Sequence, residues 1–365
     1  MRVDRFAYEL PPERIAQHPT PEREDARLMV VPTDGDLEHR TIADLAGCVP
    51  EGALIVVNDT RVIPARLLGK KAGSGGKVEI FLVRKLGTRE VDGNVLEVWR
   101  AMGKASKALK FGSEVEIGRL VVRLLGRSEE DGLLEVGIRT AGGGSVEDAI
   151  AAEGHVPLPP YIKRDDLAVD RERYQTVFAR VLGAIAAPTA GLHLTRALVG
   201  RLAVRGCEVV SVTLHVGLGT FQPVSVEDLD QHPMHSERYE VSRATASAIA
   251  RARERSVPVV AVGTTVVRAL ESAADPARDG LVLPGAGDTS ILIQPGHRFR
   301  VVDGLLTNFH LPKSTLLALV CAFAGTERVL SAYRTAVQRE YRFFSYGDAM
   351  LLSRDTSASA EGARP

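Results

Sequence analysis

The second half of the chain alternates segments of helical periodicity with short apolar runs. Apolar residues recur every three to four positions in the first kind of segment, whereas the second kind is apolar throughout, as in strands buried on both faces. The predicted helices are residues 195–205, 242–255, 265–274, 312–324 and 326–341, and the predicted strands are residues 207–216 and 257–262. Ser242 suits a helix start, Gly206 a helix end, and Pro312 a first helical position. This alternation of helix and strand predicts a mainly parallel sheet.

The first half of the chain has a different pattern. Residues 53–57 (ALIVV) predict one buried strand, and residues 70–140 predict about five short strands separated by glycine and charged residues. Such a series is typical of a small antiparallel barrel or sandwich. The simplest architecture is an α/β domain of residues 1–60 and 151–353 with an inserted antiparallel β-barrel domain at 61–150 and a flexible tail at 354–365. The strand before the insertion then joins the sheet formed after it.

Composition and charge narrow the class of protein. The 365 residues are 45% hydrophobic and 25% charged, which excludes a wholly disordered, collagen-like or coiled-coil chain. Because 46 basic residues balance 46 acidic ones, a nucleic-acid partner requires a local basic surface. The insertion, with 16 basic and 12 acidic residues, is the more basic part, although an ordinary solvated surface has the same composition. The N-terminus lacks a signal-type apolar core and no apolar run approaches about 18 residues, so we expect a cytoplasmic protein without a membrane span.

Polar residues follow the predicted strands. Residues 58–61 (NDTR), 217–222 (GLGTFQ) and 263–268 (GTTVVR) each come directly after one strand, where open α/β sheets bind their ligands. Glycine allows the backbone to approach a ligand, and a helix N-terminus offers free N–H donors. Residues 188–193 (PTAGLH) and 307–312 (TNFHLP) add polar groups before two further helices. The alternative is that all five segments are ordinary turns, caps and buried hydrogen bonds.

The histidines leave two kinds of site open. His232, His235 and Glu237 have a spacing that resembles a metal site with imidazole and carboxylate ligands. Pro233 disfavours a single helix face and no HExxH motif occurs, so proton transfer by a histidine is favoured over metal binding. The sequence also lacks the P-loop, the complete dinucleotide-binding pattern and the GxSxG elbow, which disfavours P-loop phosphotransferases, ordinary Rossmann dehydrogenases and α/β-hydrolases.

The C-terminal residues 341–348 (YRFFSYGD) interleave aromatic with charged side chains. Aromatic rings stack on unpaired RNA bases, which makes this segment a candidate RNA contact. The alternative is a hydrophobic segment packed on the core.

Ten segments together resemble one family. They are FAYELPPERIAQHP, VVNDTRVIPARLLG, VPLPPYIKR, RYQTVFA, AAPTAGLHLT, GTFQPV, HPMHSE, AVGTTVVRALES, LTNFHLPKSTL and YRFFSYGDAM. In this order, from about residue 6 to residue 352, they resemble the S-adenosylmethionine:tRNA ribosyltransferase-isomerases of queuosine biosynthesis.

The resemblance implies an activity. The family transfers and isomerises the ribosyl part of S-adenosylmethionine onto 7-aminomethyl-7-deazaguanine at the tRNA wobble position, giving epoxyqueuosine and releasing adenine and methionine. S-Adenosylmethionine is then a ribosyl donor, and no metal is expected. The implied partners are tRNAs with a GUN anticodon, which accept Tyr, His, Asn or Asp. We expect a monomer with an α/β domain and an inserted β-barrel.

The resemblance and the polar loops together suggest three sets of site residues. The candidates for proton transfer are His193, His235, Glu237, Asp59 and His310. The candidates for holding S-adenosylmethionine are Thr189, Gly191, Gly219, Thr220, Gly263, Thr264, Thr265 and Asn308. The candidates for tRNA phosphate, carboxylate or base contacts are Arg61, Arg66, Lys163, Arg164, Arg268 and Tyr346.

Two other classes of function remain as alternatives. A metal-dependent hydrolase built on His232, His235 and Glu237 predicts bound metal and inhibition by chelators. A non-catalytic RNA-binding module predicts RNA binding without turnover. The many small and titratable groups expected at one sheet edge disfavour the second alternative.

Overall fold

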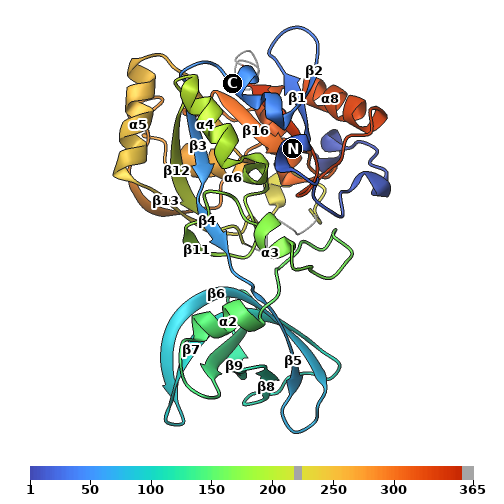
Figure 1. The fold of residues 1–365 in the computed structure, drawn as a ribbon, viewed down its shortest axis with the longest axis vertical. Helices are drawn as coiled ribbons and strands as arrows, with labels where there is room; N and C mark the ends of the chain where they lie inside the picture. Colours follow the sequence, from blue (N-terminus) through green and yellow to red (C-terminus); the bar gives the residue numbers. More distant parts are fainter. Residues whose placement is uncertain (218–223, 356–365) are drawn as a thin grey trace.

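The chain folds into two lobes joined at a narrow waist (Figure 1). The structure is a computed structural model and describes residues 1–217 and 224–355. The upper lobe holds a large sheet covered by helices, and the lower lobe is a β-barrel. The predicted mixed α/β protein with an inserted antiparallel region is therefore confirmed. Of the expected tail at 354–365, residues 356–365 lie outside the described part of the chain.

A nine-stranded sheet forms the centre of the upper lobe. Its order is β15 (Gly285–Thr289), β13 (Glu237–Val241), β12 (Glu208–Leu214), β3 (Leu54–Asn58), β14 (Val259–Val262), β16 (Gly304–Asn308), β17 (Ala349–Ser353), β1 (Arg27–Val31) and β2 (Glu38–Thr41). β12, β3, β14 and β16 pair in parallel. The flanking pairs are antiparallel apart from β17 with β1, so the expected parallel character holds for the centre of the sheet.

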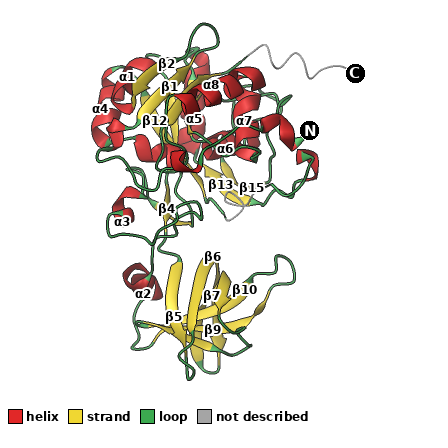
Figure 2. Ribbon diagram, turned by 90° about the vertical axis from the view of Figure 1, so that its right-hand side faces the viewer, coloured by secondary structure: helices red, strands yellow, loops and turns green. Residues whose placement is uncertain are grey.

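Helices cover both faces of this sheet (Figure 2). Alternate residues of β3 point to opposite faces, as the period of two in a strand requires. Leu54 and Val56 pack in one core, and Ile55 and Val57 in the other. The first core contains α5 (Arg243–Glu254), α6 (Thr264–Ser272), α7 (Thr315–Ala324) and α8 (Thr326–Gln338), and the second contains α1 (Leu45–Cys48) and α4 (Arg196–Val204). A strand that is buried on both faces explains the uninterrupted apolar run in the sequence.

The start of α7 differs from the prediction. Ser314 is the N-cap, and its side chain accepts a hydrogen bond from the backbone N–H of Leu317. Because this cap fixes the first helical residue at Thr315, the prediction that Pro312 takes the first helical position is wrong. Pro312 instead lies in the loop between β16 and the helix.

The six inserted strands close into an antiparallel barrel. They are β5 (Arg66–Lys71), β6 (Lys77–Val91), β7 (Asn94–Ala105), β8 (Glu114–Ile117), β9 (Leu120–Arg127) and β10 (Leu134–Thr140), followed by α2 (Val146–Glu153). Alternating residues such as Val78, Ile80 and Leu82 fill the interior. Ile63, which precedes β5, and Ile185, which follows β11 in the waist, pack into the same core and join the barrel to the upper lobe.

The waist contains short elements from distant parts of the sequence. β4 (Thr60–Val62) pairs in parallel with β11 (Val181–Ala184), and α3 (Asp170–Arg173) lies close by. The 3-10 helices among residues 1–217 and 224–355 are η1 (Val3–Phe6), η2 (Pro12–Arg14), η3 (Arg23–Asp25), η4 (Ile42–Asp44), η5 (Thr189–His193) and η7 (Leu229–Gln231). A cluster that includes Val62 of β4, Tyr174 after α3 and Leu192 of η5 packs the elements of the waist together.

Within residues 1–217 and 224–355, no single helix is long and apolar enough to cross a membrane. α7 and α8 reach that length and composition only as a pair, which is bent by 116° at Gly325.

Candidate functional site

The carboxyl ends of the four parallel strands lie at one edge of the sheet, and β3 runs from that edge through β4 towards the barrel (Figure 1). Asn58 fixes the ends of β3 and β12 to each other. Its side-chain oxygen accepts from Leu214 N at 3.1 Å and from Thr60 N at 3.1 Å, and its amide donates to Leu214 O at 2.9 Å. The polar loops predicted from the sequence therefore begin at a common edge.

Asp59 lies at this edge, and three side chains donate hydrogen bonds to its carboxylate. Ser211 Oγ and Thr213 Oγ1 donate to its carboxylate at 2.9 and 2.7 Å, and Arg180 adds an ion pair at 2.7 Å. The side chain of Asp59 is buried, while that of Arg180 is largely exposed. Sequence reasoning missed Arg180, because it lies 121 residues away and in no recognisable pattern.

His193 and Asn308 are brought together from η5 and the end of β16. The Asn308 amide nitrogen lies 3.1 Å from His193 Nε2 and 2.9 Å from Phe344 O. An amide nitrogen only donates, so Nε2 accepts and the imidazole proton is assigned to Nδ1. Burial, together with the charges of Arg342 and Arg23, lowers the pKa of His193 to about 3. His193 is therefore neutral at physiological pH.

His310 occupies a more enclosed position. Its Nε2 lies 2.9 Å from Thr307 Oγ1, and its backbone N–H donates to the Tyr333 hydroxyl at 3.0 Å. The Tyr8 hydroxyl donates to the His310 carbonyl at 2.5 Å. Burial lowers the pKa of the imidazole to about 3. These contacts anchor the segment after β16 in the aromatic core.

The N-terminus of α6 contributes glycine and two threonines. Gly263 has a φ of 97°, a conformation that favours glycine, and a Cβ at this position would lie 3.6 Å from Ala190 Cβ in η5. Thr264 and Thr265 follow and are buried. Thr265 Oγ1 has no hydrogen-bond partner among the residues that the structure describes, and the same is true of Asn308 Oδ1. Two buried polar atoms at this edge thus retain capacity for a ligand.

The other two candidates in η5 frame this region. Thr189 begins η5 and is partly exposed, whereas Gly191 is buried. A Cβ on Gly191 would come within 2.9 Å of Thr176 Cγ2, so glycine permits the close packing of these segments. Gly219 and Thr220 lie outside the described residues.

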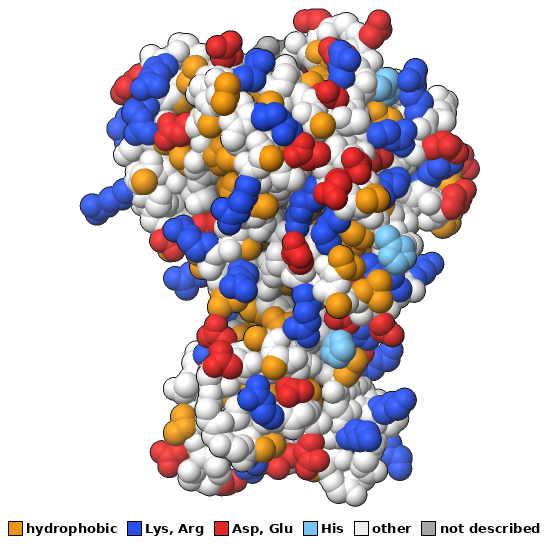
Figure 3. Space-filling view, viewed as in Figure 1, with side chains coloured by type: hydrophobic (Ala, Val, Ile, Leu, Met, Phe, Trp, Pro, Cys, Tyr) orange, Lys and Arg blue, Asp and Glu red, His pale blue; other side chains and the backbone are white. Residues whose placement is uncertain are grey.

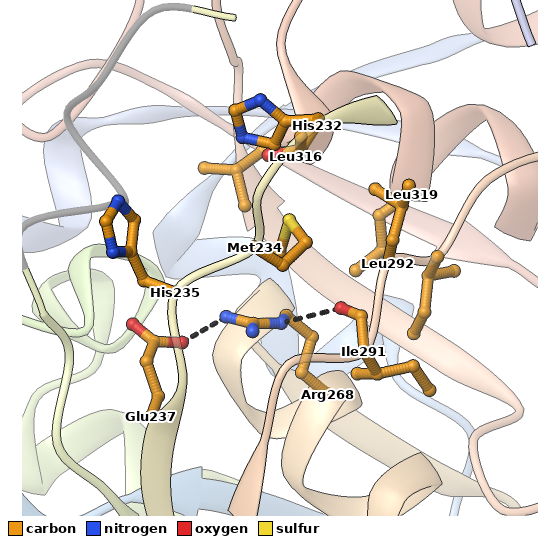
Figure 4. Close-up of a pocket in the computed structure, with 11 residues that line it drawn as sticks. His232, Met234, His235, Glu237, Arg268, Ile291, Leu292, Leu316 and Leu319 are labelled. Atoms are coloured by element: carbon orange, nitrogen blue, oxygen red, sulfur yellow. Dashed lines mark hydrogen bonds and ion pairs between the residues drawn. The ribbon is translucent and has the colours of Figure 1, made fainter. Parts of the chain in front are cut away.

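A pocket beside α6 contains a buried ion pair (Figure 4). Arg268 pairs through Nη1 with Glu237, and its Nε donates to Ile291 O at 3.4 Å. The other carboxylate oxygen of Glu237 accepts from Gly217 N at 3.0 Å. Met234 and His235 lie beside this pair in the pocket wall.

The metal arrangement considered above is not assembled. In the described part of the chain, no group of three His, Cys, Asp or Glu side chains is placed to hold a metal ion. Glu237 accepts from Arg268 and Gly217, and His235 lies beside it, whereas His232 lies farther away in the pocket (Figure 4).

Some of the predicted RNA-contact residues are exposed, and others form ion pairs within the protein. Arg61 and Lys163 are exposed. Arg66 pairs with carboxylates of the barrel and waist at 2.9 and 3.4 Å. Arg164 is held by Asp170 through two hydrogen bonds of 2.6 and 2.9 Å.

Tyr346 also donates to Asp170, at 2.7 Å, and is buried. Its ring is therefore not available at the surface for a base. Tyr341 and Phe343 are buried as well, so the aromatic segment packs on the core as the alternative interpretation held. Figure 3 shows Lys and Arg side chains on both lobes and around the waist between them.

Comparisons with known proteins identify the same family over nearly the whole chain. The sequence profile of the family described as "Queuosine biosynthesis protein" matches residues 3–352. The S-adenosylmethionine:tRNA ribosyltransferase-isomerase of Sorangium cellulosum is 58% identical, and the match covers 96% of this chain and 98% of the relative. That of Xanthomonas euvesicatoria pv. vesicatoria is 50% identical over 99% of both chains. The crystal structure of S-adenosylmethionine tRNA ribosyltransferase from Thermotoga maritima is 35% identical, covers 95% of this chain and 99% of its own, and superposes with a TM-score of 0.53.

Proposed function

Because this chain belongs to the queuosine biosynthesis protein family and is a transferase of that family, we propose that it transfers and isomerises the ribosyl moiety of S-adenosylmethionine onto 7-aminomethyl-7-deazaguanine in tRNA. The product is epoxyqueuosine at the wobble position, and adenine and methionine are released. The tRNA substrates carry a GUN anticodon, and the enzyme acts as a cytoplasmic monomer.

One structural observation supports this proposal above the others. Asn308 Oδ1, Thr265 Oγ1 and Arg268 Nη2 are buried at the carboxyl edge of the sheet, and none has a hydrogen-bond partner within the described residues. A buried polar group without a partner costs about 1–3 kcal/mol. Three such groups at one edge fit a polar ligand of extended shape, as S-adenosylmethionine is.

The chemistry of the donor suggests what the site has to supply. The sulfonium charge acidifies the neighbouring C5′ hydrogens, and a base that removes one of them begins the release of adenine. The tRNA amine then attacks the resulting unsaturated sugar. The site therefore has to provide a base, a proton for adenine and polar groups that hold the ribose.

Two of the five proton-transfer candidates suit these tasks. His193 is neutral, lies at the strand edge and contacts Asn308, and His235 is exposed in the wall of the pocket. Asp59 serves as an anchor of the edge because three neighbouring donors surround its carboxylate. His310 serves as an anchor because its imidazole, its backbone N–H and its carbonyl all bond to neighbouring groups. The start of α6 and the Asn308 amide hold the nucleoside.

Substitution of the two histidines tests these roles. We expect His193→Gln and His235→Gln each to slow single-turnover adenine release by at least about 100-fold, the range of general acid–base catalysis. His39 lies on β2 and contacts Tyr341, away from the site, so His39→Gln is the matched control. Near-normal rates for both site variants would reject the assignment.

The barrel supplies the basic surface for tRNA in this proposal. Lys70, Lys104 and Lys107 are exposed, and Lys71 is partly so. Neutralising Lys104 and Lys107 to Gln should weaken tRNA binding and lower the log–log salt slope by about 0.7–0.9 for each lost phosphate contact. Lys85 pairs with a barrel carboxylate at 2.8 Å, so Lys85→Gln serves as a control with a smaller effect. An unchanged affinity and salt slope would reject this surface.

A further inference from the structure

The pocket beside α6 contains opposite charges in a fixed arrangement. Arg268 and Glu237 are 6% and 5% exposed and form an ion pair. Gly217 N holds one carboxylate oxygen, and Ile291 O accepts from Arg268 Nε. The Nη2 group of Arg268 is buried and has no hydrogen-bond partner in the described part of the chain. A guanidinium carries five N–H donors in a rigid plane, so this pair leaves one end of the fork available.

The rest of the pocket is largely apolar. Met234, Leu292, Leu316 and Leu319 form its walls around the ion pair (Figure 4). Apolar walls with a few placed polar groups are typical of small-molecule sites. The pocket therefore suits a ligand that has a charged end and a short apolar arm.

The charge balance decides which ligand fits. Glu237 already neutralises Arg268, so a phosphate would bring uncompensated negative charge next to a buried carboxylate. An α-amino acid group brings one positive and one negative charge and leaves the pocket neutral. Its carboxylate can accept from Arg268 Nη2, and its ammonium can face Glu237.

The position along α6 agrees with this assignment. Thr264 and Thr265 begin the helix, and Arg268 lies four and three residues later. Residues at these spacings share one face of a helix. A ligand that lies along the first turn therefore passes from the unpartnered Thr265 Oγ1 to the Arg268 guanidinium.

We propose that Arg268 and Glu237 bind the amino-acid end of S-adenosylmethionine, with the apolar walls around its methylene groups. This assignment rests on the proposed ribosyl transfer and gives Arg268 a role in place of the tRNA contact expected from the sequence. In this assignment the negative charge of Glu237 faces the ligand ammonium, and Glu237 does not transfer a proton.

Decarboxylated S-adenosylmethionine provides the test, because it lacks only the carboxylate. The measurements are the equilibrium affinities of wild type and variants for both compounds, together with single-turnover adenine release. Wild type should bind S-adenosylmethionine at least about 100-fold more tightly than the decarboxylated compound, a ratio typical of a charged hydrogen bond. Arg268→Met should bring this ratio close to one.

Two further variants keep the test decisive. Arg251 and Glu208 form an exposed pair at 3.0 Å on α5 and β12, so Arg251→Met is the matched control and should retain the wild-type ratio. The double variant Arg268→Met, Glu237→Met removes both buried charges. It is used in place of Arg268→Met if the single variant does not fold.

The outcomes separate this assignment from the proposed function. A ratio that stays at the wild-type value in the folded Arg268 variants would overturn the assignment, even if adenine is still released. A wild-type protein that neither binds S-adenosylmethionine nor releases adenine would overturn the proposed function as well.

Discussion

A buried carboxylate at the waist gives the most specific stability prediction. Asp170 is fully buried and accepts four hydrogen bonds. Two come from Arg164 at 2.6 and 2.9 Å, one from the Tyr346 hydroxyl at 2.7 Å and one from Leu167 N at 2.8 Å. Asp170→Asn keeps the shape of the side chain but replaces an acceptor by an amide donor that faces other donors.

The expected magnitude follows from these contacts. Removing one partner of a buried ion pair costs about 3–5 kcal/mol, and the lower end applies here because the Arg164 side chain is 15% exposed. Asp165 in the same segment is 89% exposed and meets Arg66 only at 3.4 Å. Asp165→Asn is therefore the matched control, with an expected cost below about 1 kcal/mol.

Urea unfolding measures the difference. With a denaturant slope of about 3 kcal/mol/M, a loss of about 3 kcal/mol lowers the midpoint by about 1 M. Equal midpoints for the Asp170 and Asp165 variants would refute the argument that burial and the number of donors determine the cost.

The same substitution has a pH signature. Burial raises the pKa of Asp170, but hydrogen bonds from Arg164, Tyr346 and Leu167 outweigh burial and hold the pKa below its usual value. A lowered pKa stabilises the fold above the unfolded value of about 3.9, and this contribution disappears as the pH falls through the folded pKa. The difference in unfolding free energy between wild type and Asp170→Asn should therefore be constant near neutral pH and shrink below about pH 4.

Two other predictions concern the barrel junction and the buried imidazoles. Gly154→Ala should lower the melting temperature, because a Cβ at residue 154 would lie 2.1 Å from Pro64 O. Gly142→Ala is the control and should leave the melting temperature unchanged, because a Cβ there would have no atom within 4 Å. Equal melting temperatures for the two variants would contradict this packing argument. Burial lowers the pKa values of His193 and His310 to about 3, so their imidazole NMR signals should not titrate between pH 5 and 8. Because the unfolded histidines bind protons below about pH 6.5 and the folded ones do not, the free energy of unfolding should fall as the pH drops below that value. A titration midpoint above about 5 for either ring would show that it is not enclosed as described.

The central sheet could be predicted because its signals are local. β3 and β14 are apolar on both faces, and α5 begins at Ser242, which caps it as expected. The outer strands lack such signals. β15, with the sequence GAGDT, has no alternation of apolar residues and is held by its pairing with β13. β2, with the sequence EHRT, is a polar strand at the end of the sheet order and pairs with β1.

The sheet edge at which the polar loops begin was predictable from the sequence, but the contacts of their side chains were not. Parallel strands bring their carboxyl ends together, so polar loops identify the edge. Whether a side chain is free or occupied depends on distant partners, such as Arg180 for Asp59. The ion pair of Arg268 with Glu237 likewise joins a helix to a strand 31 residues away, and sequence spacing carries no sign of it.

The most direct test of the proposed function is a turnover assay without added metal. Purified protein is mixed with S-adenosylmethionine and tRNA that carries 7-aminomethyl-7-deazaguanine, and adenine release and the mass of the modified nucleoside are followed. The proposed ribosyl transfer predicts adenine together with the mass gain of the ribosyl-derived group. Binding of the tRNA without any adenine, or adenine only after a metal is supplied, would contradict it.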